Sequence, residues 1–250
     1  MKPTEKDLLE RRIWRHFNKG IMEYGLLEEG DHILLGISGG KDSLALLEFM
    51  ARRARIYRPQ IQLEALHVRM TNIAYESDNH YLEQFAAEHG VRLHIRETSF
   101  DASTDTRKSP CFLCSWNRRK MLFETAKDLG CNKIALGHHQ DDILHTTLLN
   151  FSFQGQFSTM PARLRMRKFP MTIIRPFCMV QERDLAAWAV MQEYQKQKKL
   201  CPYERDSHRS DMRNIFDQIE QMNPEARHSM WNALDREGKL VDANNHVVNE

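Results

Sequence analysis

The sequence predicts an α/β protein: an open parallel sheet of about five strands with helices on both faces and a helical C-terminal extension. Three observations support this prediction. Apolar, strand-like runs alternate with helical segments, a glycine-rich turn joins the first of these runs to a helix, and the alternation stops after Arg175-Pro176. Such alternation favours a parallel sheet, because parallel strands need a crossover connection that is usually a helix.

The individual elements follow from hydrophobic periodicity, read in order along the chain. An amphipathic helix rich in arginine and aromatic residues is expected at residues 5–24. After it we predict strands at 32–37, 62–68, 91–97, 132–137 and 172–175, and helices at 43–56, 78–89, 112–129 and 141–151.

The C-terminal part is predicted to be helical. One long helix is expected at residues 180–197, Cys201-Pro202 then breaks the chain, and two helices follow at 211–221 and 224–234. We therefore divide the chain into an N-terminal helix (1–30), a central α/β domain (31–178) and a helical extension that carries Cys201 (179–250).

Composition and charge exclude some classes of protein. Hydrophobic residues make up 41% of the chain and charged residues 28%, as in ordinary globular proteins. The sequence contains neither an apolar run of bilayer length nor a signal-peptide core, so we expect no membrane association and a cytoplasmic location. The net charge of +2 excludes a polycation, although nine Lys and Arg against three acids lie between Pro161 and Lys199. Such a patch attracts polyanions, but charged faces are more often merely solvated.

The glycine-rich turn, Ser38-Gly39-Gly40-Lys41-Asp42-Ser43, is the most informative segment. A turn between a strand and a helix start gathers backbone N–H groups and the positive end of the helix dipole, which together bind anions. The turn lacks the kinase-type pattern G-x-x-x-x-G-K-[ST]. It resembles the S-G-G-x-D-S loop of the PP-loop ATP pyrophosphatases, which bind the pyrophosphate of ATP and transfer AMP to a substrate oxygen.

A second polar segment, Gly137-His138-His139-Gln140-Asp141-Asp142, follows the fourth predicted strand. Two acids at a helix start serve as an N-cap and a first-turn charge, or hold Mg²⁺ against phosphates. We assign Asp141 to the cap and Asp142 to Mg²⁺. Either histidine contacts a phosphate or packs at the strand end.

The cysteines form a third candidate site. Cys111 and Cys114 form a C-x-x-C before a helical, basic run, and Cys201 is a further cysteine in a loop. Three thiolates leave a fourth position open on a [4Fe–4S] cluster or on zinc. The alternatives are a redox pair and a zinc site closed by a histidine such as His208. Cys131 and Cys178 are interpreted as packing residues.

In series, these motifs resemble the tRNA 2-thiocytidine synthetases, which are PP-loop enzymes, over roughly residues 31–213. Further matching segments are Pro110-Cys111 to Arg119, Lys133-Ile134-Ala135-Leu136-Gly137-His138-His139, Asp141-Asp142-Ile143-Leu144, Leu149-Asn150, Met160-Pro161 and Ile174-Arg175-Pro176.

The resemblance implies a PP-loop, adenine nucleotide α-hydrolase-like fold and a set of site residues. Lys41 and Asp142 would be catalytic, with Asp142 also binding Mg²⁺. His67, at the end of the second strand, would lie near the adenine ring, although a strand-end histidine is more often structural. ATP would be bound by Ser38, Gly39, Gly40, Lys41, Asp42, Ser43, His67, Gly137 and His138, and the [4Fe–4S] cluster by Cys111, Cys114 and Cys201.

The implied reaction is a thiolation of tRNA. The enzyme would adenylate the C2 oxygen of an anticodon-loop cytidine (position 32) and replace it with sulfur, carried on the cluster or as a persulfide on the cysteines. A sulfur donor such as a cysteine desulfurase and a homodimer are also implied. We expect Arg118, Arg119, Arg163, Arg165, Arg167 and Lys168 to contact tRNA phosphates.

One departure from the family keeps alternatives open. The family usually has a second C-x-x-C late in the chain, whereas Cys201-Pro202-Tyr203-Glu204 lacks the second cysteine. The alternatives are a thiolase acting on a uridine, a cluster-free ligase that forms an amide or lysidine-type bond, and a non-catalytic nucleotide or cluster sensor. A cluster enzyme that removes sulfur from thiolated bases is a further alternative.

Overall fold

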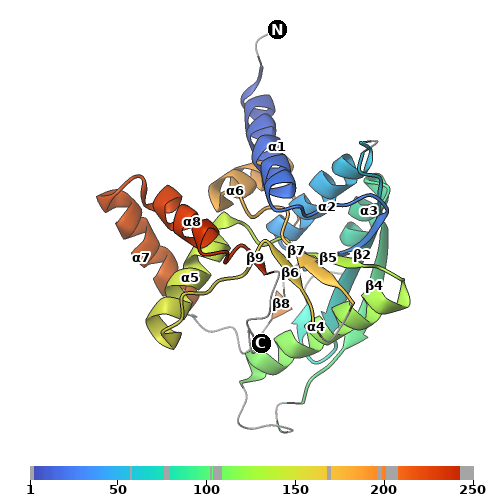
Figure 1. Ribbon diagram of the computed structural model, residues 1–250. Helices are drawn as coiled ribbons and strands as arrows, with labels where there is room; N and C mark the ends of the chain where they lie inside the picture. The colour runs from blue at the N-terminus through green and yellow to red at the C-terminus, as the bar shows by residue number, and fades with distance from the viewer. Residues whose placement is uncertain are drawn as a thin grey trace.

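The computed structural model describes residues 3–56, 58–75, 79–101, 103, 109–167, 170–195, 199–200 and 208–242. Its centre is a seven-stranded sheet in the order β4-β2-β1-β5-β7-β6-β9 (Figure 1). The strands are β1 (Asp31–Gly36), β2 (Ile61–Met70), β4 (Arg92–Thr98), β5 (Lys133–Ala135), β6 (Arg163–Arg165), β7 (Thr172–Ile174) and β9 (Val241–Asp242). Strands β3 (Ala74–Tyr75) and β8 (Lys199–Leu200) form a separate antiparallel pair.

The five predicted strands correspond to β1, β2, β4, β5 and β7. Each pairs in parallel with its neighbour in the sheet, which confirms the predicted fold class. The sequence did not predict β6, which runs antiparallel to β7, or β9, which pairs with β6. These strands are three and two residues long, too short to show an alternating pattern.

The eight helices of the described residues are α1 (Glu5–Glu23), α2 (Lys41–Ala54), α3 (His80–Glu88), α4 (Pro110–Asp128), α5 (Gln140–Gln154), α6 (Glu182–Met191), α7 (His208–Met222) and α8 (Ala226–Arg236). Buried side chains of α2 and α3 pack on one face of the sheet, in the same cluster as those of α1 and α6. Helix α4 packs on the opposite face. Helices α5, α7 and α8 form a group beside the sheet, on the left of Figure 1.

Helix α6 is shorter than predicted. The expected helix at 180–197 ends at Met191, because Glu193 has a φ of 54° and cannot continue it. The Tyr194 N–H donates to the Ala189 carbonyl (3.0 Å) and the Glu193 N–H to that of Val190 (3.1 Å). This is a Schellman motif with glutamate at the position that glycine usually fills.

The N-terminal helix is part of the main hydrophobic core. Ile13 and Phe17 of α1 are fully buried, and the ring of Phe17 lies 5.6 Å from that of Phe177. At the end of α1, the Tyr24 hydroxyl accepts a hydrogen bond from the Trp231 indole N–H on α8 (2.9 Å). The division at residues 30 and 178 stays a proposal, since both flanking parts pack against the central one.

None of the described helices combines the length and the hydrophobicity needed to cross a bilayer.

Candidate nucleotide site

The glycine-rich turn connects β1 to α2. Gly39 has a φ of 83°, a left-handed conformation that favours glycine. Gly40 is the N-cap of α2 and has no side chain to cap the first turn. The Ser43 hydroxyl donates to the Gly40 carbonyl (2.8 Å) and accepts from the Ser38 N–H (3.2 Å). The hydrogen bonds of the Ser43 hydroxyl therefore close the turn. Because the start of α2 has no side-chain cap, its backbone N–H groups suit an anion.

The segment 137–142 lies directly against this turn. A Cβ added to Gly137 would come within 2.9 Å of the Asp42 carbonyl oxygen, so only glycine permits this approach of the two backbones. His139 is the N-cap of α5: its Nδ1 accepts from the Asp142 N–H (3.4 Å), and the Asp142 carboxylate accepts from the His139 N–H (3.0 Å).

The prediction that Asp141 caps α5 is therefore wrong. Its carboxylate instead accepts hydrogen bonds from the Glu182 N–H (2.7 Å) and from Arg227 Nη2 (2.8 Å). Burial alone would raise the pKa of Asp141. The charge of Arg227 and the hydrogen bond from the Glu182 N–H outweigh burial, and the pKa lies below its usual range.

The two segments enclose a cavity of about 350 Å³, which we call the loop pocket. It lies at the carboxyl ends of β1 and β5, where open α/β sheets bind their ligands, and against Leu66 and Val68 of β2. Arg118 and Leu122 of α4 form the opposite wall. The lining residues are Gly36, Ile37, Ser38, Asp42, Ser43, Leu66, Val68, Arg118, Leu122, Leu136, Gly137, His138 and Asp142.

The predicted nucleotide residues are thus brought together only in part. Ser38, Asp42, Ser43, Gly137, His138 and Asp142 line the loop pocket, whereas Gly39, Gly40, Lys41 and His67 do not. The Lys41 ammonium donates to both carboxylate oxygens of Asp42 (2.9 Å each) and to Glu182 Oε1 (3.4 Å).

His67 lies between two pocket residues but faces the other side of β2. Leu66 and Val68 line the loop pocket, while the His67 ring is fully buried and its Nδ1 donates to the Ile37 carbonyl (2.8 Å). Burial lowers the pKa of His67, and its Nε2 has no hydrogen-bond partner among the residues that the structure describes. Only the backbone of His67 is placed to approach a base in the pocket.

The cysteine helix α4 begins beside this pocket. Ser109 caps α4 and Pro110 occupies its first turn, and Cys111 and Cys114 follow at once, exposed and half-buried respectively. Residues 111, 114, 118 and 122 recur at helical spacing, so both cysteines lie on the face of α4 that reaches the loop pocket through Arg118. Cys201 and Cys111 cannot be compared in position, because Cys201 lies outside the described residues.

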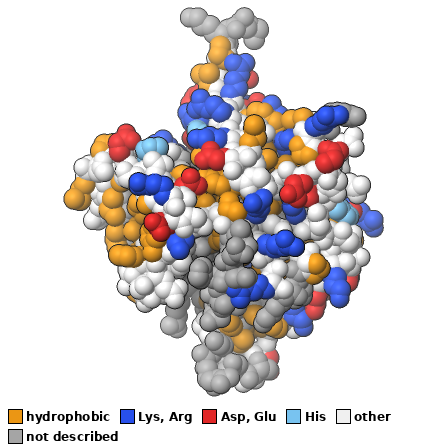
Figure 2. Space-filling model, viewed as in Figure 1, with side chains coloured by type: hydrophobic (Ala, Val, Ile, Leu, Met, Phe, Trp, Pro, Cys, Tyr) orange, Lys and Arg blue, Asp and Glu red, His pale blue; other side chains and the backbone are white. Residues whose placement is uncertain are grey.

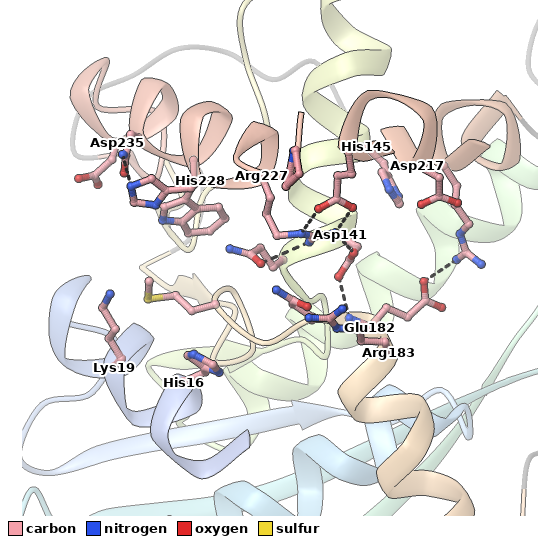
Figure 3. A pocket seen from close by; sticks show the side chains of 18 of the residues that line it. His16, Lys19, Asp141, His145, Glu182, Arg183, Asp217, Arg227, His228 and Asp235 are labelled. Carbon is pink, nitrogen blue, oxygen red and sulfur yellow. Dashed lines mark hydrogen bonds and ion pairs between the residues drawn. The ribbon is translucent and has the colours of Figure 1, made fainter. Parts of the chain in front are cut away.

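A second and larger cavity, which we call the helix pocket, has a volume of about 1030 Å³ and lies between α1, α5, α6, α7 and α8 (Figure 3). Its lining mixes both signs of charge, and sequence analysis did not predict it. Asp141 and Glu182 lie at its centre, where Arg227 and Arg213 reach them from α8 and α7 (both 2.8 Å). These ion pairs join helices far apart in sequence, which explains why no local pattern revealed them.

The arginines expected to contact tRNA do not form one surface. Arg118 lines the loop pocket and donates to the Val68 carbonyl (3.4 Å). Arg163 donates to the Gly25 carbonyl (3.0 Å). With Arg165 it lines a different cavity at the amino ends of β5 and β7, whereas the loop pocket lies at the carboxyl ends of the strands. On the face in Figure 2, blue side chains gather along α1 and are elsewhere mixed with red ones. Lys168 lies outside the described residues.

Comparison with known proteins places these features in context. A sequence profile of the PP-loop domain matches residues 8–230. The tRNA-cytidine(32) 2-sulfurtransferase of Polaromonas naphthalenivorans (strain CJ2) is 33% identical over 250 residues, which cover 97% of this chain and 79% of that protein. The protein of the same name from Paracidovorax citrulli (strain AAC00-1) is 34% identical, over 92% of this chain and 75% of that protein.

Among solved structures, the U34-tRNA thiolase NcsA from Methanococcus maripaludis, determined with its [4Fe-4S] cluster, superimposes with a TM-score of 0.78. The match covers 98% of this chain and 84% of that chain at 24% sequence identity. At this identity the likeness shows a shared fold.

Proposed function

The chain belongs to the PP-loop family and, within it, to the tRNA-cytidine(32) 2-sulfurtransferases, and we propose that it replaces the C2 oxygen of tRNA cytidine 32 with sulfur at the expense of ATP. One observation carries the proposal. The phosphate-loop residues and Asp142 share the loop pocket with the face of α4 on which Cys111 and Cys114 lie. A nucleotide and a sulfur-carrying group would therefore meet at one substrate.

The loop pocket suits the adenylate part of ATP. Leu66, Val68, Leu122 and Leu136 provide an apolar wall for the adenine ring, and the turn at 38–43 provides uncapped N–H groups for the phosphates. Asp142, whose side chain is about one-third exposed, supplies the oxygen ligand that Mg²⁺ prefers. We propose this division of roles for the nucleotide residues.

Activation precedes substitution in the proposed reaction. The C2 oxygen of cytidine attacks the α-phosphorus of ATP, the bond to the β-phosphate breaks, and pyrophosphate leaves. A sulfide then attacks C2, and AMP leaves with the former carbonyl oxygen, so no net oxidation is required. The loop stabilises the charge on the departing pyrophosphate, Mg²⁺ held by Asp142 would neutralise it further, and the pocket holds the reactants in line.

The described cysteines fit an iron–sulfur site. Cys111 lies in the first turn of α4, where the helix dipole stabilises a thiolate, and is open to solvent, and Cys114 follows at the start of the second turn. Cys111, Cys114 and Cys201 would hold a [4Fe–4S] cluster, which would supply sulfur through its fourth iron. Arg118, one turn further along the same face, would hold the adenylated cytidine or a phosphate against this wall.

The remaining partners belong to the same proposal. Its tRNA substrate presents the target base in the unpaired anticodon loop, where a base is unstacked at low cost. A cysteine desulfurase as sulfur donor, a cytoplasmic location and a homodimer follow from the family resemblance.

Nucleoside mass spectrometry tests the proposal. Unmodified tRNA is incubated without oxygen with cluster-reconstituted protein, ATP, Mg²⁺ and sulfide, and the digested tRNA is analysed for 2-thiocytidine. We expect 2-thiocytidine that requires ATP and is lost in Cys111→Ala. A thiolated uridine would keep the mechanism and change the substrate, and full activity of Cys111→Ala would contradict the cluster role.

A further inference from the structure

The phosphate-loop lysine has a competing anion on a neighbouring helix. Besides its own neighbour Asp42 (2.9 Å), Lys41 Nζ contacts Glu182 Oε1 (3.4 Å), and the side chains of Lys41 and Glu182 are only 17% and 23% exposed. The second oxygen of Glu182 lies 2.8 Å from Arg213 Nη2 on α7. Glu182 thus lies between two cations, one from the phosphate loop and one from the rim of the helix pocket, and Figure 3 shows Glu182 in that pocket.

Glu182 is fixed at its own end of α6. Its backbone N–H donates to the Asp141 carboxylate (2.7 Å), which Arg227 holds from the other side (2.8 Å). The backbone of Glu182 is therefore anchored on the segment that also carries Asp142.

Helix α6 is also held along α2 at the far end. The Glu48 carboxylate on α2 accepts hydrogen bonds from Trp188 Nε1 (3.2 Å), Gln192 Nε2 (3.0 Å) and the Tyr194 hydroxyl. Because α6 is held on Asp141 of α5 at its start and on Glu48 of α2 at its far end, we expect the backbone of Glu182 to stay in place if the Lys41 ammonium turns towards the loop pocket.

A bound phosphate and Glu182 therefore compete for one ammonium group. We propose that Glu182 is a positioning residue for Lys41: it holds the ammonium beside the phosphate loop, weakens nucleotide binding and speeds the release of pyrophosphate. The proposal rests on the assignment of the loop pocket to ATP. At partly buried sites such a competition is stronger than in bulk water.

The variant Glu182→Gln tests this competition, since it keeps the size of the side chain and removes its charge. We expect Mg·ATP and pyrophosphate to bind about threefold to tenfold more tightly, the range of a partly exposed ion pair. With ATP as substrate, KM should fall and inhibition by pyrophosphate should strengthen, while kcat stays equal or decreases. Glu193→Gln, an exposed residue at the other end of α6, removes the same charge and should leave both affinities unchanged.

A double-mutant cycle separates Lys41 from other causes. Calorimetry of Mg·ATP binding is measured for wild type, Glu182→Gln, Lys41→Met and the double variant. If Glu182 acts through Lys41, the Glu182 substitution changes affinity only when Lys41 is present. The proposal would be overturned if the Glu182 substitution changed the Mg·ATP affinity equally in the Lys41→Met background, or if Glu182→Gln alone bound ATP more weakly than wild type.

The binding assay is independent of thiolation. Wild-type protein that binds Mg·ATP but forms no thiolated nucleoside would contradict the proposed reaction, and the cycle would still decide the role of Glu182. Wild-type protein that binds no nucleotide would overturn both.

Discussion

Asp141 and Asp142, neighbours at the start of α5, face different pockets. Asp142 lines the loop pocket with Ser38 and Ser43, whereas Asp141 lines the helix pocket and is paired with Arg227. Consecutive residues of a helix lie about 100° apart, so a D-D pair at a helix start serves two sites at once. One acid is thereby assigned to chemistry and the other to structure.

Substitution of the two aspartates should separate these roles. In Asp142→Asn, we expect pyrophosphate release in the presence of tRNA and ATP to fall on the order of 100-fold, because the proposed Mg²⁺ ligand loses its charge. Its unfolding free energy should change by less than about 1 kcal/mol, since asparagine still accepts the His139 N–H.

In Asp141→Asn, we expect the unfolding free energy to fall by about 1–3 kcal/mol, because Glu220 is then the one charged partner of Arg227 among the described residues. For both variants, urea unfolding measures the unfolding free energy and a pyrophosphate assay measures the rate of pyrophosphate release. Equal stability losses in the two variants would contradict the assignment.

Gly137→Ala should disrupt the nucleotide site. The new methyl group would lie 2.9 Å from the Asp42 carbonyl oxygen, so one of the two backbones must shift. We expect Mg·ATP affinity to fall by more than about tenfold. Gly36→Ala is the control: its Cβ would meet the end of the Leu136 side chain at 3.0 Å, which can rotate away, so the loss of affinity should be smaller.

Glu193→Gly should stabilise the protein. Glu193 ends α6 with a φ of 54°, a conformation that is costly for glutamate and easy for glycine. We expect the unfolding free energy to rise by about 0.5–1 kcal/mol. Glu237→Gly is the matched control, because Glu237 is an exposed C-cap of α8 with a φ of −84°, and glycine there should not stabilise. A gain in both variants would contradict the argument from φ.

His67 should make the protein less stable in mild acid. Burial lowers the pKa of His67, so the unfolded chain binds the proton more readily than the folded one. Stability is therefore complete above the unfolded pKa of about 6.5 and decreases as the pH falls below it, by at most about 1.4 kcal/mol per pH unit.

The urea midpoint of wild type, measured between pH 7.5 and 5.5, should therefore fall on acidification. In His67→Asn, which keeps a donor for the Ile37 carbonyl, the decrease should be smaller. Burial also lowers the pKa values of His16 and His145, so part of the decrease should remain. An identical pH profile for wild type and variant would exclude His67 as the cause.

The parts of the molecule with local signals were predictable. The strand, glycine turn and helix at residues 31–54 form one continuous stretch of chain with the expected structure, and the polar segment at 137–142 starts a helix as expected, although His139 is its cap. Ligands bind at the carboxyl ends of the strands in open parallel sheets, and this general rule was enough to predict that Ser38 and Asp142 share a pocket.

The parts that depend on long-range contacts were not predictable. His139 rather than Asp141 caps α5, because Arg227 and the Glu182 N–H hold the Asp141 carboxylate from α8 and α6. Similarly, Lys41 is turned towards Glu182, 141 residues further along the chain. A residue type permits several partners, and only the fold determines which of them is adjacent.

The hydrogen bond between Tyr24 and Trp231 has a consequence for synthesis on the ribosome. Trp231 lies 207 residues after Tyr24 in the sequence. The end of α1 can therefore form this hydrogen bond only after that stretch of chain has been translated. Until then the Tyr24 hydroxyl lacks its hydrogen bond from the Trp231 indole. The helix that is synthesised first is thus among the last to gain all of its tertiary contacts. A ribosome-bound chain arrested before α8 should therefore be cleaved by protease near the end of α1, and one arrested well beyond α8 should not.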